Sequence, residues 1–137
     1  MRGNFMKEKI KVFFVHSKKM KPKASKETLE YLIEREAPDT YEFFDGYCGE
    51  NIIEQVENQR PEIVFLSQNK SIDALELVKR LKSVHPSTVV FVILSDMIDD
   101  EQETIDEYMA AGAYKCYFAT LVLDTLVHDM HVALNLE

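Results

Sequence analysis

Short apolar runs alternate with stripes of apolar residues spaced three or four positions apart along the chain. The segment 61–67 holds four consecutive apolar residues between Glu62 and Ser67, a pattern that predicts a strand buried on both faces. A polar loop follows, and apolar residues then recur with helical spacing as far as Leu81. The pattern therefore predicts a strand, a short loop and a helix, with Ser67 at the carboxyl end of the strand.

The same alternation predicts five strands and five helices. Strands are expected at residues 9–15, 41–44, 61–67, 89–94 and 114–118, and Asp45-Gly46 indicates a turn after the second. Helices are expected from Ser25 to the residue before Pro38, around Ile52 to Val56, from Ile72 to Leu81, around Ile105 to Met109, and from Leu121 to Leu136.

Strands that alternate with helices indicate a parallel sheet with helices on both faces. At a length of 137 residues, the flavodoxin-like strand order 2-1-3-4-5 fits best. We therefore predict an α/β fold, a flavodoxin-like (βα)5 three-layer sandwich. Residues 1–8 are expected to be a flexible N-terminus and residues 9–137 a single domain.

Composition indicates a globular cytoplasmic chain. Apolar residues make up 46% of the sequence, yet no run approaches the ~18 residues that cross a bilayer, and no signal-peptide core is present. Cys48 and Cys116 form no CxxC motif, which favours free thiols. We expect no membrane insertion.

Charge is unevenly distributed along the chain. The net charge is −8, but nine of the 16 basic residues lie in the first 26 positions beside one acid, Glu8. The acidic remainder argues against nucleic-acid binding. The first expected loop carries Lys18, Lys19, Lys21 and Lys23. They are either a solvated loop or an anion-binding site, although no glycine-rich phosphate cradle accompanies them.

Two other charged groups have a plain and a functional interpretation. The acids between Asp96 and Glu107 favour the N-terminus of the fourth helix, or they belong to a partner-binding surface. Asp124, His128 and His131 share one helix face, a spacing that could hold a metal. A solvated face is the better interpretation, and we expect no metal.

Several segments resemble one known family. Residues 61–66 are similar to its third strand, 75–82 to its third helix, 92–95 to the end of its fourth strand, and 111–113 to the turn before its fifth strand. From residue 9 to about 135, the chain resembles the receiver domain of bacterial two-component response regulators. The resemblance implies the flavodoxin-like fold, a place in phosphorelay signalling, and partner contacts through the surface of helix 4, strand 5 and helix 5.

The departures from the family fall on its phosphotransfer residues. The phospho-accepting Asp is replaced by Ser67, and the acid pair by His16-Ser17. The Lys is replaced by Ala119, and only the hydroxyl of Ser95 survives. An acyl phosphate needs a carboxylate nucleophile, and divalent cations prefer carboxylate ligands. We therefore interpret the chain as a degenerate pseudo-receiver without catalytic residues or cofactors, in which Ser67 is inert, a mimic of one switch state, or the substrate of another kind of kinase.

Two functional hypotheses follow. The first is a non-enzymatic interaction module in a signalling or localisation complex, acting alone or as a homodimer; its partner-binding residues would be Tyr108, Tyr117, Val122 and Thr125. The second is a sensor of a small ligand or phosphate, which would use the basic loop and the pocket at the strand carboxyl ends. A flavodoxin-type enzyme is less favoured because the loop after the first strand has no glycine.

Overall fold

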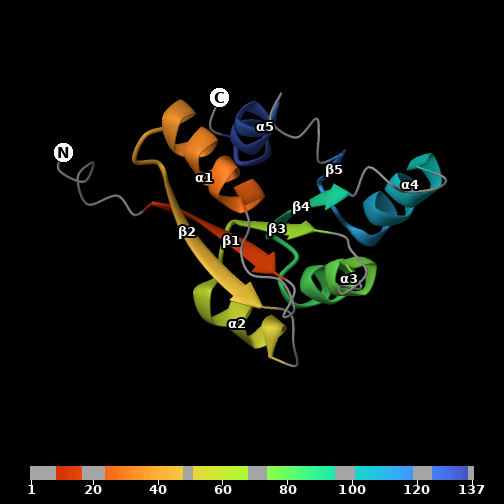
Figure 1. The fold of residues 1–137 in the computed structure, drawn as a ribbon. Coiled ribbons are helices and arrows are strands. Elements are labelled where there is room, and N and C mark those ends of the chain that lie inside the picture. Colours follow the sequence, from red (N-terminus) through yellow and green to blue (C-terminus); the bar gives the residue numbers. More distant parts are fainter. Residues whose placement is uncertain are drawn as a thin grey trace.

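A five-stranded parallel sheet forms the centre of the computed structural model, which describes residues 9–16, 24–47, 51–67, 74–94, 101–118 and 125–135 (Figure 1). All five expected strands are present, and the fourth has the bounds that the sequence predicts. The strands are β1 (Ile10–His16), β2 (Tyr41–Tyr47), β3 (Ile63–Ser67), β4 (Val89–Leu94) and β5 (Lys115–Phe118).

The strand order is β2-β1-β3-β4-β5, which confirms the predicted flavodoxin-like order. β1 pairs with both of its neighbours, so Val12 lies opposite Phe43 of β2 and Ile63 of β3. The chain adds β2 on one side of β1 and then crosses over to add β3 on the other. Ligands of open α/β sheets bind outside the carboxyl ends of the strands at such a switch point.

Five helices cover the two faces of this sheet. α1 and α5 pack on one face, whereas α2, α3 and α4 pack on the other (Figure 1). None of the described helices is both long and apolar enough to cross a membrane. The helices are α1 (Ala24–Glu36), α2 (Ile52–Gln59), α3 (Ala74–Val84), α4 (Glu101–Ala111) and α5 (Leu126–Ala133).

Successive strand residues contribute to two separate core layers. In β1, Phe13 and Val15 belong to the layer beneath α2, α3 and α4, whereas Val12 and Phe14 belong to the layer beneath α1 and α5. All four side chains are buried. Because helices cover both faces, each strand can be apolar at consecutive positions, which explains the uninterrupted runs in the sequence.

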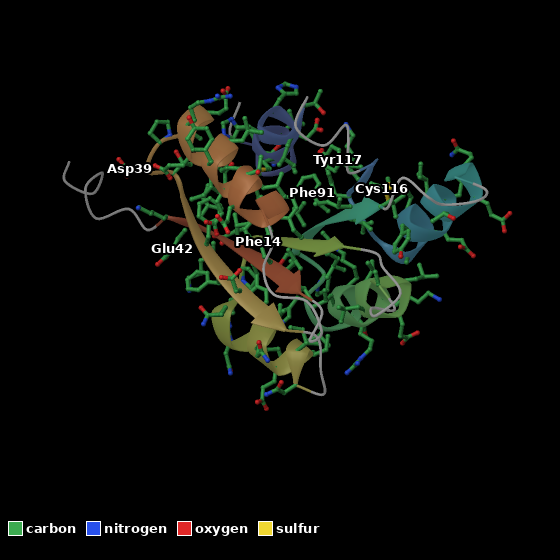
Figure 2. The ribbon with its side chains drawn as sticks, viewed as in Figure 1. Phe14, Asp39, Glu42, Phe91, Cys116 and Tyr117 are labelled. Atoms are coloured by element: carbon green, nitrogen blue, oxygen red, sulfur yellow. The ribbon has the colours of Figure 1, made fainter. Side chains whose placement is uncertain are left out.

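A row of aromatic side chains crosses the sheet beneath α1 and α5, with one ring from each strand. Ring centroids are 6.0 Å apart for Phe43 and Phe14, and 5.2 Å apart for Phe14 and Phe65. The row continues with 5.4 Å from Phe65 to Phe91 and 5.8 Å from Phe91 to Tyr117. Figure 2 shows Phe14, Phe91 and Tyr117 following one another towards β5. The row therefore ends at Tyr117 on an edge strand.

Strand β2 is longer than the sequence predicts. The expected turn at Asp45 and Gly46 is wrong, because the strand continues through both residues to Tyr47. A Cβ atom on Gly46 would lie 2.5 Å from Phe13 Cζ and 2.7 Å from Gln55 Oε1. This glycine leaves room for a neighbouring ring, a recognised use of glycine inside a strand.

Helix α5 is shorter than the predicted range of 121–136. Thr125 has a non-helical φ of −129° and precedes the first helical residue, Leu126. The helix ends at Ala133, and Asn135 adopts a left-handed φ of 59°. Asparagine tolerates this conformation better than most residues, so it favours the end of a helix here.

Candidate functional site

The carboxyl ends of β1 and β3 meet at the switch point of the sheet. These strands end at His16 and Ser67, and their register pairs Val15 with Leu66 one residue earlier. The fold therefore brings the backbones of His16 and Ser67 together, and it confirms that Ser67 ends its strand. Neither side chain belongs to the described part of the structure.

The residues that end the five strands contain no carboxylate. They are His16, Tyr47, Ser67, Leu94 and Phe118. An imidazole, two hydroxyls and two apolar side chains supply no anionic oxygen, whereas divalent cations favour carboxylate ligands. Among these strand ends, the chain therefore offers neither a carboxylate nucleophile nor a strong ligand for Mg²⁺.

The other residues predicted at this edge lie outside the described ranges. They are Ser17, Ser95 and Ala119, together with the loop lysines Lys18, Lys19, Lys21 and Lys23. The predictions of a degenerate phosphorylation site and of an anion-binding loop therefore stay predictions.

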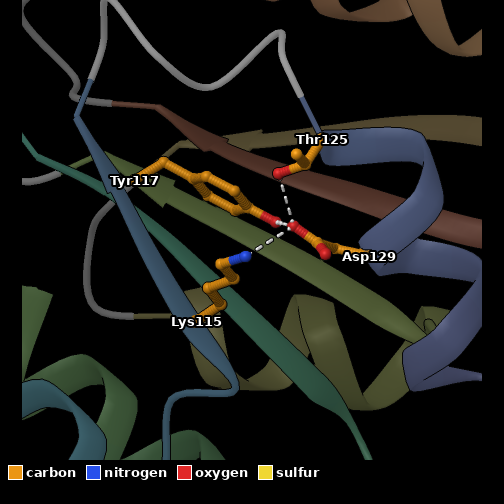
Figure 3. A network of polar contacts seen from close by, with 4 residues as sticks. All are labelled: Lys115, Tyr117, Thr125 and Asp129. Atoms are coloured by element: carbon orange, nitrogen blue, oxygen red, sulfur yellow. Dashed lines mark hydrogen bonds and ion pairs between the residues drawn. The ribbon is translucent and has the colours of Figure 1, made fainter.

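A half-buried polar network joins β5 to α5 at the end of the aromatic row. The Oδ2 atom of Asp129 accepts hydrogen bonds from Tyr117 Oη at 2.5 Å, Lys115 Nζ at 2.9 Å and Thr125 Oγ1 at 2.9 Å (Figure 3). The Asp129 side chain is only 14% exposed, whereas that of Lys115 is 44% exposed. One carboxylate oxygen on α5 thus holds two side chains of β5 and the residue that precedes α5.

The surroundings of Asp129 favour its ionised form. Burial alone raises the pKa of this carboxyl, but hydrogen bonds from Tyr117, Lys115 and Thr125 and the charge of Lys115 outweigh burial and lower the pKa. The pKa of Tyr117 is raised, first by burial, then by its hydrogen bond to Asp129 and the negative charge there. The network therefore consists of a carboxylate and a neutral phenol around neutral pH.

This network was not predicted from the sequence, although the sequence contains a signal for it. Asp129 lies one residue before Met130 and three after Leu126, and both of these side chains are fully buried. A charged residue on the apolar side of a short helix needs partners, because an unpaired buried charge is costly. Lys115 and Tyr117 then become candidate partners, since alternate residues of a strand point to the same face.

Two of the four predicted partner-binding residues are buried. Tyr108 is 3% exposed and packs in the layer beneath α2, α3 and α4, and Tyr117 is 5% exposed at the end of the aromatic row. The prediction that these two side chains contact a partner at the surface is therefore wrong. Thr125 is exposed, and Val122 lies outside the described residues.

Other apolar side chains on the same elements do reach the surface. Met109 of α4 is 44% exposed, Tyr114 before β5 is 40% exposed, and Val132 of α5 is 44% exposed. Acidic side chains accompany Met109 on α4, where Asp106 accepts a hydrogen bond from Gln102.

The histidines of α5 do not share one environment. His128 is exposed, whereas His131 is half-buried and stacks on Tyr41 with ring centroids 6.0 Å apart. Asp124, the other member of the considered metal set, lies outside the described ranges. Within those ranges, no three His, Cys, Asp or Glu side chains come together as metal ligands would.

Comparison with known proteins supports the fold through solved structures, whereas comparison of sequences gives no match. No protein-family model and no curated protein matches the chain. Solved structures do match. The signal receiver domain of a DNA-binding response regulator from Colwellia psychrerythraea 34H is 15% identical, with a TM-score of 0.69, over 93% of this chain and 98% of that one.

Two further solved structures give the same result. A response regulator from Thermotoga maritima is 16% identical with a TM-score of 0.70, covering 93% of this chain and 99% of its own. The receiver domain of NtrX from Brucella abortus is 19% identical with a TM-score of 0.66, covering 92% and 99%. The chain therefore has the flavodoxin-like fold found in response regulator receiver domains.

Proposed function

We propose that this chain is a receiver-like signalling module that does not use aspartate phosphorylation and has no enzymatic activity. The observation that carries the proposal is the serine at the carboxyl end of β3, inside a fold shared with receiver domains over 93% of the chain. Ser67 cannot form an acyl phosphate, and none of the other strand ends supplies a carboxylate. In this proposal the chain keeps the fold of receiver domains and has lost their aspartate phosphorylation.

Such a module acts through protein contacts in a cytoplasmic signalling or localisation complex. We assign these contacts to the α4–β5–α5 surface, defined here by the exposed residues Met109, Tyr114, Thr125 and Val132. Exposed apolar side chains contribute most of the binding free energy when a partner removes them from water. The partner is another protein or a second copy of the chain, without nucleic acid or membrane insertion.

A matched pair of tyrosine variants tests the assignment. Tyr114 is 40% exposed beside β5, and Tyr31 is 66% exposed on α1, outside the proposed surface. Proteins captured from the native cell by the wild-type chain, by Tyr114→Ser and by Tyr31→Ser are compared by quantitative mass spectrometry. We expect Tyr114→Ser to lose at least about tenfold of the specific partner, because aromatic side chains often dominate interfaces.

The control variants decide between the possible results. Tyr31→Ser should retain the partner, and so should Ser67→Ala, because the proposal gives Ser67 no part in binding. The proposal would be overturned if Ser67→Ala lost the partner while both tyrosine variants kept it. Equal loss in both tyrosine variants would show that the contact is not specific to the α4–β5–α5 surface.

The alternative function is the sensor, and the position of the lysines in the sequence supports it. The four loop lysines lie two to seven residues after His16, the last residue of a strand that adjoins β3. A thermal-shift panel of nucleotides and inorganic phosphate tests this alternative. A shift that disappears in Lys18→Ala/Lys19→Ala would favour the sensor, whereas no shift with any ligand would count against it.

A further inference from the structure

Helix α5 buries few apolar side chains against the rest of the protein. It is eight residues long, and its fully buried side chains are Leu126 and Met130. A helix of this length is not stable by itself in water, so contacts with the rest of the protein must hold it in place. Its preceding residue, Thr125, makes no side-chain capping bond to the helix backbone and bonds to Asp129 instead.

The Asp129 network supplies the polar part of this attachment. Two of its three donors, Lys115 and Tyr117, belong to β5, whereas the acceptor belongs to α5. These bonds exist only while α5 lies against β5. They join the edge of the sheet to the helix through a carboxylate that is 14% exposed (Figure 3).

Only the bonds from Lys115 and Tyr117 break when α5 moves away from β5, because Thr125 directly precedes α5 and its bond to Asp129 moves with the helix. The Lys115 side chain is 44% exposed, so water can replace its acceptor. The Tyr117 ring packs at the end of the aromatic row and is 5% exposed while α5 covers it, so moving α5 away breaks the bond of its hydroxyl to the Asp129 carboxylate. A hydrogen bond to a charged group stabilises a protein more than one between neutral groups, so the loss of this bond opposes displacement of α5.

We propose that Asp129, Tyr117, Lys115 and Thr125 form a latch that fixes the position of α5 against β5, independently of the strand carboxyl ends. This inference rests on the proposed function and deepens it, because α5 carries part of the α4–β5–α5 surface. An internal carboxylate then keeps that surface in one arrangement without a phosphorylation signal. Loosening the latch would change the surface while the sheet stays intact.

Amide hydrogen exchange on the isolated protein tests the latch. Tyr117→Phe removes only the hydroxyl, and Asp129→Ala removes the shared acceptor. In both variants, amides of α5 should exchange about tenfold faster than in the wild type, the effect of losing a hydrogen bond to a charged group. Amides of α3 that exchange through local opening, on the opposite face of the sheet, should keep their wild-type rates and serve as the internal reference.

Three results would overturn the latch. The first is unchanged exchange in α5. The second is equal acceleration in α3 and α5 of Tyr117→Phe, since this indicates general destabilisation. The third is an acceleration of α5 in Ser67→Ala that matches Tyr117→Phe, because the latch would then depend on the strand ends. The exchange experiment needs no partner. The latch can therefore fail while the proposed function holds, and the proposed function can fail while the latch holds.

Discussion

Tyr117 of β5 donates a 2.5 Å hydrogen bond to Asp129 of α5, and this bond joins the aromatic row of the sheet to a helix on its surface. The phenol ring packs against Phe91, while its hydroxyl reaches the carboxylate. One side chain therefore serves both the apolar core and the polar network. We expect the stability of the β5–α5 region to depend on this pair.

The first prediction concerns the free energy of unfolding. Asp129→Ala should lower it by about 2 kcal/mol, because the buried Tyr117 hydroxyl loses its acceptor. Asp106→Ala is the matched control, since this exposed aspartate of α4 accepts one hydrogen bond from Gln102. It should change stability by less than about 0.5 kcal/mol. Urea unfolding measures both, and equal losses would contradict the importance of the network.

The second prediction is a dependence on acid pH. The pKa of Asp129 in the folded protein lies below its ordinary value of 3.8. As the pH falls, the unfolded chain therefore binds this proton before the folded chain does. The stability contributed by the Asp129 charge is present above pH 3.8 and is lost as the pH falls through the folded-state pKa.

Comparison with Asp129→Asn isolates this contribution, because asparagine does not titrate and all other carboxyls are shared. The difference in unfolding free energy between the wild type and Asp129→Asn should be constant near neutral pH and shrink below pH 3.8. Urea titrations at a series of pH values measure it. A difference that stays constant into strong acid would show that the ionised carboxylate is not what the network needs.

The third prediction concerns the close packing of Gly46 and Phe13. Gly46→Ala should destabilise the protein by about 1–3 kcal/mol, because the new methyl group overlaps the ring of Phe13. Shortening the neighbour relieves this overlap. In the background of Phe13→Leu, the same glycine substitution should cost clearly less, and a double-mutant cycle measures the difference. Strictly additive effects would refute the steric explanation.

Most of the fold could be predicted from the sequence because the three inner strands, β1, β3 and β4, are largely buried on both faces. Runs such as residues 89–94 identify strands directly, and their alternation with helical stripes leads to the observed order. The errors occurred where tertiary packing overrides local preference. Asp45-Gly46 has the composition of a turn, yet the Phe13 ring requires the glycine inside a strand.

The candidate site was less accessible to sequence reasoning. The position of Ser67 follows from the strand pattern, since the end of a strand is a local feature. The burial of Tyr117 and its bond to Asp129 depend on how α5 is seated on the sheet, which spacing along one element does not reveal. Tyrosine can lie in a core or on a surface, and the choice here depends on a distant acceptor.

Our central proposal is that this chain, which has the fold found in receiver domains, does not accept a phosphoryl group at its strand ends. Its most direct test is incubation with acetyl phosphate and Mg²⁺, followed by intact mass and amide NMR spectra, with a phosphorylatable receiver domain treated in parallel. We predict no phosphoryl adduct and no shift of amide resonances, because Ser67 at the end of β3 offers a hydroxyl and no carboxylate nucleophile. A phosphoryl adduct with shifts around β3 and α5 would contradict the claim and restore a conventional phosphorylation switch.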